Sequence, residues 1–365
     1  DELLQLAAQV VPNARKDHSR ELDMLLTAGE RIAMALLAMA IREMGVEAIS
    51  LTGSQAAIIT DEKHADARIQ EVRATRVREE LGNGRVVIVA GFQGVSRTRE
   101  VTTLGRGGSD TTAVALAAAL GADRCDIYTD VEGVYTSDPR RVKNARLLRT
   151  IDYEEMVELP TSGAQVMHPR AVEIGARFNV PIRVLSSFND QDDGGTLITN
   201  QEPGMEGLTL TGLACESGYA RVSFRGLPPE MRITSAILNR LAEKSDSVDM
   251  LAQVDREDGK RQLQLTVKDE SVTEGRALFE ELLRENGGES LDVQPGFTRV
   301  ALVGSGMYGL PGVYARTYSA LLNAGIEVAA VSSSSISISL LIRSGDEDRS
   351  LQILHEAFDL GEERK

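Results

Sequence analysis

The spacing of apolar residues over positions 1–195 alternates between helical and strand-like periods. Residues 23–44 carry apolar side chains at helical spacing as far as Gly45, and residues 113–120 form an Ala- and Leu-rich helix that stops at Gly121. Short β-rich runs lie between such helices at 46–51, 86–90 and 126–129. Alternation of this kind predicts a parallel sheet with helices on its faces.

The pattern changes after a polar, acidic and glycine-containing segment at 189–195, which we interpret as a linker or long loop. Two later stretches share the order strand-helix-strand-strand-helix, with a period of about eighty residues. The strands are predicted at 220–224, 248–253, 262–267, 299–303, 328–331 and 336–342, and the helices at 235–244, 274–285, 312–324 and 347–358. Two tandem α+β modules after an α/β domain favour a regulatory role.

A glycine-rich loop precedes the helix that is expected to begin near Ala113. Gly105, Gly107 and Gly108 allow close approach of the backbone to a ligand and φ > 0. The helix cap is expected from Ser109, Asp110, Thr111 or Thr112. The free N–H groups of the helix start favour an anion, and Arg106 adds a guanidinium that holds a carboxylate or phosphate by two hydrogen bonds. A tight turn with a cap is the alternative interpretation.

The segment 128–140 follows a predicted strand, so it lies at a strand's carboxyl end, where open α/β sheets bind ligands. Thr129 and Asp130 offer a hydroxyl and a carboxylate. Tyr135 offers a flat face for a base, and Arg140 has the reach for a phosphate. Taken alone, the segment is explained equally well as an ordinary turn loop.

Glu30 follows the small residues 27–29, and a carboxylate in such a turn at a helix start suits an amino group. Taken alone, it is better explained as a solvated residue in a first helical turn. His168, which precedes Pro169, is interpreted as a packing or turn histidine. The remaining histidines lack metal-ligand spacing and are His18, His64 and His355. No metal site is predicted.

Composition narrows the classes of function. The net charge of −15 repels phosphate backbones and anionic membranes, so neither nucleic acid nor membrane is an expected partner. The longest apolar run, residues 32–41, is about half of the ~20 residues needed to span a bilayer. Cys125 and Cys215 are predicted to be reduced thiols, which favours the cytoplasm.

Together these residues resemble the aspartate kinases of the amino-acid kinase family. The segments that carry the resemblance are 25–30, 52–55, 91–94, 103–112, 129–140, 163–169 and 183–188. The tandem modules are similar to that family's paired ACT domains, and the resemblance covers essentially the whole chain. It implies an open, mostly parallel α/β sheet sandwiched by helices at 1–200, a first ACT-like module at 208–295 and a second at 296–365.

The resemblance implies ATP-dependent phosphorylation of the β-carboxylate of L-aspartate, with Mg²⁺ bridging the phosphates. A carboxylate is already a nucleophile, so positioning and charge neutralisation carry catalysis. The implied catalytic residues are Arg106 and Asp110. The implied substrate ligands are Glu30, Gln70, Glu71, Phe92, Arg106, Gly107, Gly108 and Ser109, with Glu30 on the amino group. The implied nucleotide ligands are Ser109, Thr129, Asp130, Tyr135, Thr136, Ser137, Asp138, Pro139, Arg140 and Gln165.

The resemblance also implies a homodimer or larger homo-oligomer that is inhibited by threonine, lysine or both through its ACT modules. The implied regulatory residues are Val248, Asp249, Gln253, Met307, Pro311, Gly312, Val313, Ser333 and Ser334. Without the resemblance, the serine run at 332–335 is explained equally well as a polar edge strand or loop.

Three features depart from the family pattern. The family's N-terminal Lys-Phe-Gly-Gly-Thr-Ser motif is absent, and if the molecule begins at Asp1 we expect little kinase activity, with a catalytically silent amino-acid-binding protein as the alternative. Gln165 stands where some members carry Lys, and residues 227–230 replace an Asp-x-Pro-Gly loop. A glutamate or acetylglutamate kinase is a nearer alternative, which Arg106, Glu30 and the ACT-like modules disfavour.

Overall fold

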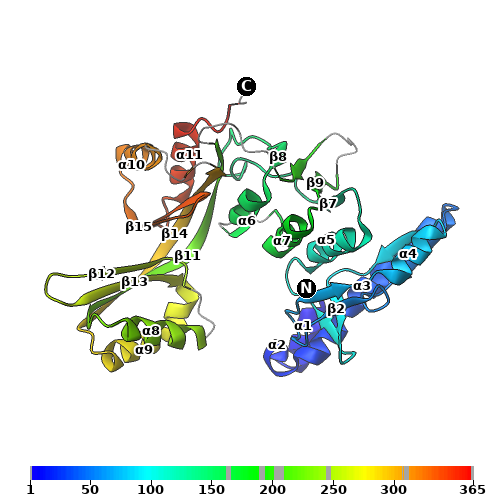
Figure 1. Cartoon of the computed structure of the whole chain (residues 1–365), viewed down its shortest axis with the longest axis horizontal. Coiled ribbons are helices and arrows are strands. Elements are labelled where there is room, and N and C mark those ends of the chain that lie inside the picture. Colours follow the sequence, from blue (N-terminus) through cyan, green and yellow to red (C-terminus); the bar gives the residue numbers. More distant parts are fainter. Residues whose placement is uncertain are drawn as a thin grey trace. The chain divides into compact units, whose positions relative to one another are not determined.

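The computed structural model describes residues 2–161, 166–188, 194–200, 209–243, 248–305, 307 and 312–362. These residues form two compact units (Figure 1). The first unit holds the residues up to 134, 147–160 and 166–200, and the second holds 135–146 and 209–362. Residues 189–193 of the predicted linker lie outside the described part. Each unit is described by itself.

The first unit alternates helices and strands, as predicted. Its helices are α1 (Glu2–Val10), α2 (Ala14–Asp17), α3 (Ser19–Glu43), α4 (Thr75–Gly82), α5 (Gly108–Leu120), α6 (Tyr153–Thr161) and α7 (Pro169–Phe178). Its strands are β1 (Ala48–Leu51), β2 (Ile58–Thr60), β3 (Ile69–Val72), β4 (Val86–Val89), β5 (Gln93–Ser96), β6 (Val101–Thr103), β7 (Cys125–Thr129), β8 (Thr150–Ile151), β9 (Ile182–Ser186) and β10 (Thr196–Ile198).

The strands of the first unit are distributed over three sheets. Strands β1 and β4 form a parallel pair, and the two four-stranded sheets have the orders β7-β9-β10-β8 and β3-β2-β5-β6. The pairs β7–β9, β8–β10 and β2–β5 are parallel, whereas the other neighbours are antiparallel. The predicted mixed α/β class with parallel pairing is confirmed.

Helix α3 buries both polar and apolar side chains. It buries Leu22, Asp23, Thr27 and Ala38. In the described part of the chain, α3 is the helix whose length and composition would let it cross a membrane. A core helix of a soluble protein satisfies the same criterion, so this observation is weak evidence for a membrane span.

The second unit is built on one six-stranded antiparallel sheet with the order β12-β13-β11-β14-β16-β15. Its strands are β11 (Thr209–Leu227), β12 (Leu251–Asp255), β13 (Arg261–Lys268), β14 (Ser290–Ser305), β15 (Val328–Ser333) and β16 (Ser337–Arg343). Its helices are α8 (Met231–Glu243), α9 (Asp269–Glu285), α10 (Val313–Asn323) and α11 (Glu347–Ala357). The repeated strand-helix-strand-strand-helix order is therefore present.

Strands β11 and β14 join the two repeats into one sheet. They pair over most of their length, from Thr209 with Ser305 to Arg225 with Ser290, with bulges that shift the register. The sequence predicted much shorter strands at these two places, because only their apolar parts show a strand period. One core gathers around Phe224 on one repeat, and the other gathers around Leu354 on α11.

The segment 135–146 belongs to the second unit, although the residues on both sides of it belong to the first. The Thr136 N–H donates to the Arg146 carbonyl at 2.9 Å, which closes the segment on itself. The Leu213 N–H of β11 donates to the Thr136 carbonyl at 2.7 Å, and Val142 is fully buried in the core around α11.

Candidate functional site

Helix α5 begins at Gly108, five residues before the predicted start near Ala113. Gly107 is the N-cap, with φ +64°, a backbone conformation that favours glycine. No side chain caps the helix, so the predicted cap is wrong: the Thr111 and Thr112 hydroxyls donate instead to the carbonyls of Gly107 and Gly108, at 2.8 and 2.7 Å. A helix start without a side-chain cap suits an anion.

His168 packs directly against the glycine-rich loop. A Cβ placed on Gly107 would lie 2.1 Å from the His168 Cβ and 2.4 Å from its Cγ. His168 is also the N-cap of α7, where its Nδ1 accepts the Arg170 N–H at 3.3 Å, with Pro169 at the helix start. Its interpretation as a turn or packing histidine therefore omitted its contact with the loop, which no spacing in the sequence reveals.

Arg170 holds the other side of this loop. Its guanidinium donates to the Leu104 carbonyl at 2.8 Å and to the Ala67 carbonyl at 2.7 Å. The first turn of α7 therefore fixes the loop through Arg170 and His168. Sequence reasoning missed Arg170, because its partners are backbone carbonyls more than sixty residues away in the chain.

Asp23 on α3 anchors the strand that enters the loop. Its carboxylate is fully buried and accepts the Thr103 hydroxyl at 2.6 Å and the Thr103 N–H at 3.2 Å. It also accepts the Ala65 N–H at 3.1 Å and lies 2.7 Å from the His64 Nδ1. A buried carboxylate requires such partners. The one signal of this role in the sequence was an acidic residue at the start of an apolar helix.

Phe92, a predicted substrate residue, lies against the same loop. Its backbone has φ +66°, which is a strained conformation for a bulky side chain and is common at functional sites. The Phe92 N–H donates to the Thr112 hydroxyl at 3.0 Å, and its carbonyl accepts the Leu104 N–H at 2.9 Å. A Cβ on Gly108 would lie 3.1 Å from the Phe92 Cα. The structure therefore brings Phe92 and Gly108 together.

Glu30 and Ser109 line one pocket of about 470 Å³. Glu30 lies in the middle of α3 rather than in a turn at a helix start, which corrects the prediction. The other lining residues are Val77, Leu81, Val87, Val89, Gly91, Thr112, Ala113, Leu116 and Leu120. Two predicted substrate ligands thus share a mostly apolar cavity beside the start of α5.

Arg106 is exposed at the tip of the loop. Its guanidinium makes no hydrogen bond or ion pair with any residue that the structure describes. Gln70 and Glu71 are on β3, at the edge of their sheet, and they do not line the pocket of Glu30 and Ser109. The Glu71 carboxylate pairs with Arg73 at 3.0 Å, and this hydrogen bond lowers its pKa.

Asp110 lies in the first turn of α5 and is partly buried. Burial raises the pKa of its carboxyl group, while the backbone N–H and the charge of His168 act in the opposite direction. Burial also lowers the pKa of His168, and the neighbouring Arg170 adds to this effect. The site therefore favours the neutral imidazole and makes the Asp110 carboxylate more basic than usual.

The predicted nucleotide loop is divided between the units. Thr129 ends β7 in the first unit, where its carbonyl accepts the Ser187 N–H at 2.7 Å and its hydroxyl donates to Asp130 at 3.1 Å. The carboxyl ends of β7 and β9 thus lie side by side. The predicted ligands in the second unit are Tyr135, Thr136, Ser137, Asp138, Pro139 and Arg140. Gln165 lies outside the described residues.

Ser137 and Asp138, in the second part of the predicted nucleotide loop, carry polar side chains that could bind a ligand. Ser137 is buried, and within the described structure its hydroxyl has no hydrogen-bond partner. Asp138 pairs with the exposed Arg140 at 3.1 Å. Burial would raise the Asp138 pKa, but hydrogen bonds from Arg140 outweigh it, so the carboxylate is held below its usual range. Arg140 is thus presented on the surface with its charge partly balanced.

The predicted regulatory residues of the first module are engaged within the chain. Asp249 pairs with Arg299 of β14 at 2.5 Å. Gln253 accepts the Thr234 hydroxyl at 2.9 Å, and Val248 packs on the core of the first repeat. Burial raises the Asp249 pKa, although Arg299 opposes this. Asp249 therefore links the two repeats through β14.

In the second module, Met307 and Val313 are buried in the core, and Gly312 is the N-cap of α10 with φ +110°. Ser333 ends β15, and the Ser334 hydroxyl lies 2.9 Å from that of Ser337. Pro311 lies outside the described residues.

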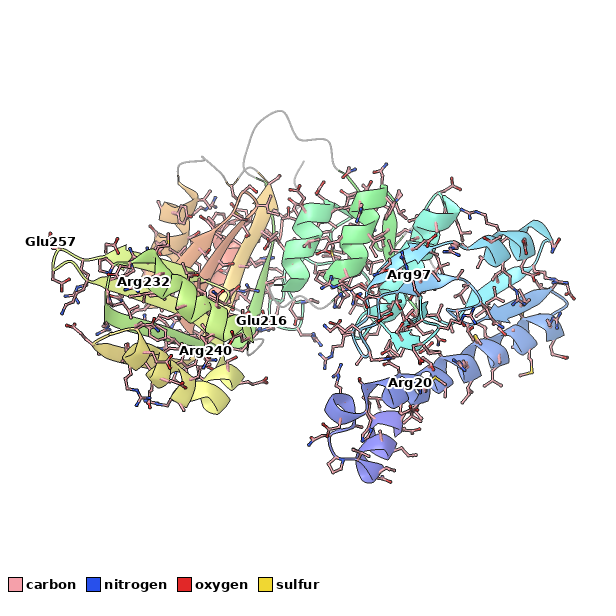
Figure 2. All side chains as sticks on the ribbon, turned by 60° about the horizontal axis from the view of Figure 1, so that its bottom comes forward. Arg20, Arg97, Glu216, Arg232, Arg240 and Glu257 are labelled. Atoms are coloured by element: carbon pink, nitrogen blue, oxygen red, sulfur yellow. The ribbon has the colours of Figure 1, made fainter. Side chains whose placement is uncertain are left out.

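A charged cluster surrounds Asp249. Glu216, labelled in Figure 2, lies on β11 and pairs with Arg299 at 3.2 Å and with Lys268 at 2.6 Å. The Tyr219 hydroxyl donates to Glu216 at 2.6 Å. Burial would raise the Glu216 pKa, but these hydrogen bonds and cations lower it overall.

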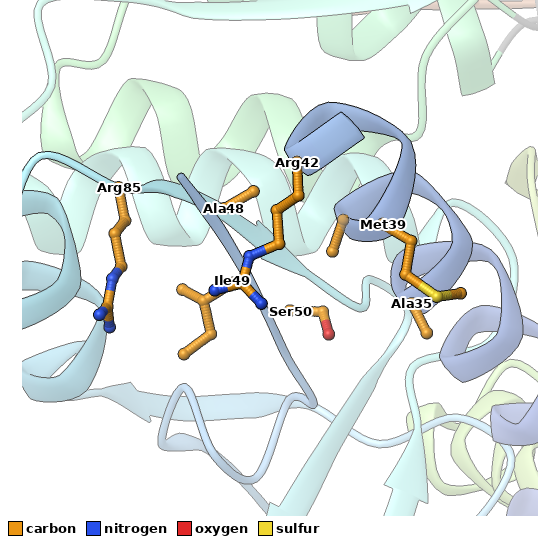
Figure 3. A pocket seen from close by; sticks show the side chains of 8 residues that line it. Ala35, Met39, Arg42, Ala48, Ile49, Ser50 and Arg85 are labelled. Carbon is orange, nitrogen blue, oxygen red and sulfur yellow. The ribbon is translucent and has the colours of Figure 1, made fainter. Parts of the chain in front are cut away.

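A second pocket of about 350 Å³ lies between α3 and β1 (Figure 3). Arg42 on α3 and Arg85 before β4 contribute side chains to it. Both guanidinium groups face Glu47, at 3.3 and 4.0 Å, and Arg85 also pairs with Glu80 at 2.6 Å. Because these charges are balanced, this pocket is a poorer anion site than the loop at Arg106.

The described residues contain no group of three or more His, Cys, Asp or Glu side chains arranged to hold a metal ion. A magnesium ion that is held mainly by the phosphates of a nucleotide needs one or two protein carboxylates at most. The donor set is therefore compatible with Mg²⁺ entering as part of a nucleotide complex. Both cysteines are free thiols, as predicted.

A model of the amino acid kinase family matches residues 2–186, and a model of the ACT domain matches residues 300–358. The aspartokinase of Corynebacterium efficiens is 46% identical over 366 residues, which cover 99% of this chain and 86% of the relative. Aspartokinase 2 of Bacillus subtilis is 43% identical over 360 residues, with 99% of this chain and 87% of the relative covered.

Solved structures give the same result. Escherichia coli aspartokinase III in complex with aspartate and ADP superposes with a TM-score of 0.79 at 28% identity, over 98% of this chain and 80% of that one. The same enzyme in complex with lysine and aspartate superposes with a TM-score of 0.73 at 29% identity, over 97% and 79% of the two chains. The similarity extends through both units.

Proposed function

The chain belongs to the aspartokinases of the amino acid kinase family, and we propose that it transfers the γ-phosphoryl group of ATP to the β-carboxylate of L-aspartate, forming 4-phospho-L-aspartate. This reaction would be the first step of lysine, threonine and methionine synthesis. The free thiols of Cys125 and Cys215 support a cytoplasmic location. The solved complex of Escherichia coli aspartokinase III with aspartate and ADP supports the choice of substrate and nucleotide.

The observation that carries the proposal is the uncompensated cation at the loop. Arg106 has no partner in the described structure of a protein with a net charge of −15. It stands beside the uncapped start of α5, so a dianionic amino acid would meet a guanidinium and free N–H groups. Glu30, in the pocket that it shares with Ser109, would accept the substrate's ammonium group.

The chemistry requires positioning more than proton transfer. The substrate β-carboxylate is the nucleophile, so no side chain has to remove a proton from it. Phe92, Gly107 and Gly108 would shape the acceptor site. Gln70 and Glu71 of β3, which lie outside the pocket of Glu30 and Ser109, would border the substrate from another side. Arg106 would orient the acceptor and balance charge as the phosphoryl group moves. Asp110, held beside His168, would orient the helix start that faces the substrate.

The nucleotide would be held by the loop that starts at Thr129 and Asp130. Tyr135 would stack on the base. The nucleotide would supply a hydrogen-bond partner for the buried Ser137 hydroxyl, which has none among the described residues. Arg140 would reach a phosphate, with Gln165 as a further ligand. Mg²⁺ would neutralise the phosphate oxygens.

Feedback control would operate through the ACT modules. We propose that threonine, lysine or both bind at Asp249 and Gln253 of the first module and at the serine run of the second, and the lysine complex of the Escherichia coli relative supports this. Asp249 would have to exchange Arg299 for the effector's ammonium group. The exposed edge strands β12 and β15 would pair modules in a homodimer or larger oligomer.

The direct test is a coupled assay of ADP release with aspartate, glutamate and acetylglutamate as acceptors. We expect turnover with aspartate only, together with binding of ADP by calorimetry. Turnover of glutamate above aspartate would overturn the substrate assignment. Titration with threonine and with lysine tests regulation separately, and absence of both heat and inhibition would exclude it.

A further inference from the structure

His355 is a buried histidine of the second module that makes a specific contact with the predicted nucleotide loop. Its side chain is fully buried in α11, and its Nε2 lies 2.9 Å from the Thr136 hydroxyl oxygen. Nothing in the sequence distinguishes this histidine, since it lacks metal-ligand spacing. The two residues are 219 positions apart in the chain.

The donor and acceptor roles in this hydrogen bond depend on the imidazole tautomer. The Thr136 oxygen already accepts the Arg146 N–H at 2.9 Å. We assign the neutral tautomer that carries its proton on Nδ1, because its Nε2 then gives the Thr136 hydroxyl proton an acceptor. The His355 Nδ1 has no partner among the described residues, so Thr136 is the one polar group that justifies a histidine at this buried position.

The rest of the segment is fastened to the same module. The Leu213 N–H of β11 donates to the Thr136 carbonyl, and a Cβ on Gly212 would lie 3.0 Å from that oxygen. Arg141 forms an ion pair with Asp348 of α11. Thr136 itself is fully buried, so its backbone is held from β11 and its side chain from α11.

We propose that His355 is a positioning residue for the nucleotide: through Thr136 it fixes the loop 135–140. The inference rests on the proposed function, which assigns this loop to ATP. It also supplies a route for regulation, because any movement of α11 relative to β11 displaces Thr136 and with it Ser137 and Asp138.

The test compares three variants of α11. His355→Ala removes the acceptor and leaves the buried Thr136 hydroxyl unpaired, so we expect the ATP KM and the ADP Kd to rise about fivefold or more, with the aspartate KM unchanged within about twofold. His355→Gln returns a polar group at similar reach and should restore most of the nucleotide affinity. Leu351→Ala truncates a similarly buried side chain of the same helix that cannot form a hydrogen bond with Thr136.

Leu351→Ala should lower the melting temperature at least as much as His355→Ala while leaving the nucleotide constants unchanged. Hydrogen exchange should become faster in residues 135–146 of His355→Ala only. Thr136→Val combined with His355→Ala should be non-additive, because both changes remove one bond.

Two results would overturn the inference. One is a His355→Ala protein whose nucleotide KM and Kd stay within about twofold of the parent. The other is a Leu351→Ala protein whose nucleotide affinity falls as far, since His355 would then only stabilise the fold. Failure of the proposed function looks different: the unmutated protein would bind no ADP and phosphorylate no aspartate.

Discussion

The imidazole of His168 occupies the space that a side chain on Gly107 would need, with 2.1 Å between the two Cβ positions. The glycine-rich loop and the start of α7 are therefore fitted to each other, and the contact fixes the loop at the place where Arg106 projects. Position 107 therefore requires glycine for two independent reasons: its φ is +64°, and His168 leaves no space for a side chain.

Gly107→Ala should therefore disrupt the site. We expect a loss of stability of about 2–4 kcal/mol and a fall in kcat/KM for aspartate of more than about tenfold, because strain and a clash combine. Gly84→Ala is the matched control, since Gly84 also has a positive φ of +76° but no atom within 4 Å of its Cβ position. It should cost about 1 kcal/mol and leave catalysis unchanged. Equal effects of the two changes would show that the contact with His168 is unimportant.

Asp23→Ala should destabilise the first unit by about 2–4 kcal/mol, because it leaves the N–H groups of the buried Thr103 and the half-buried Ala65 without an acceptor. Asp23→Asn keeps one acceptor oxygen and should cost less. Urea unfolding monitored by circular dichroism measures both. Glu43→Ala, on the exposed end of the same helix, should change stability by less than about 0.5 kcal/mol. A stable Asp23→Ala protein would contradict the role of Asp23 as an anchor.

Arg106→Ala should raise the aspartate KM and lower kcat, with kcat/KM reduced about a hundredfold, because in the proposed function the guanidinium both binds and orients the acceptor. Arg106→Lys should recover only part of the loss, since an ammonium group cannot form the bidentate pair. Arg76→Ala, an exposed arginine on α4, makes the same change in net charge and should have no effect. An unchanged kcat/KM in Arg106→Ala would remove this residue from the site.

Stability of the second unit should fall in mild acid because of His355. Its pKa is lowered chiefly by burial, with Arg146 adding to the effect and Glu356 opposing it. The folded pKa lies below the ordinary value of about 6.5, so the stabilising contribution of the neutral ring is present above that value and is lost as pH falls through the folded pKa. Thermal unfolding measured between about pH 7.5 and 5 should show a smaller fall in melting temperature for His355→Gln than for the unmutated protein. Identical pH profiles would refute the assignment.

Arg299→Met should destabilise the second unit by an amount that depends on pH. The change leaves Asp249 and Glu216 without the cation they share, so both carboxyl pKa values rise. Protonation relieves their repulsion, so stability relative to the parent should improve as pH falls from about 7 toward 5. Urea midpoints at the two pH values test this. A loss of stability that is independent of pH would show that Arg299 stabilises the unit by packing rather than by its charge.

The sequence revealed the parts of the site that are contiguous in the chain. The glycine-rich loop, the segment after β7 and the repeated element order were all recognisable, because glycine content, apolar period and turn residues are local properties. The start of α5 was misplaced, since Gly107 caps it by conformation and not by a side chain.

The residues that hold the two loops in place were not recognisable from the sequence. Asp23, His168, Arg170 and His355 act through partners between 41 and 219 positions away, or through the space beside a glycine, and no periodicity encodes such pairs. Sequence reasoning assigned both histidines to packing or left them without a role. Three-dimensional contacts were needed to connect them with the two loops.

Synthesis on the ribosome delivers α11 last among the described helices and the segment 135–146 much earlier. That segment is fastened to partners on β11 and α11, and its hydrogen bond with His355 spans 219 positions. A nascent chain can thus fold most of its first unit before the partners of the segment 135–146 have been synthesised. On the proposal that His355 fixes this loop, full ATP affinity would develop only after α11 has been synthesised, so a partly made chain would bind ATP more weakly than the finished one.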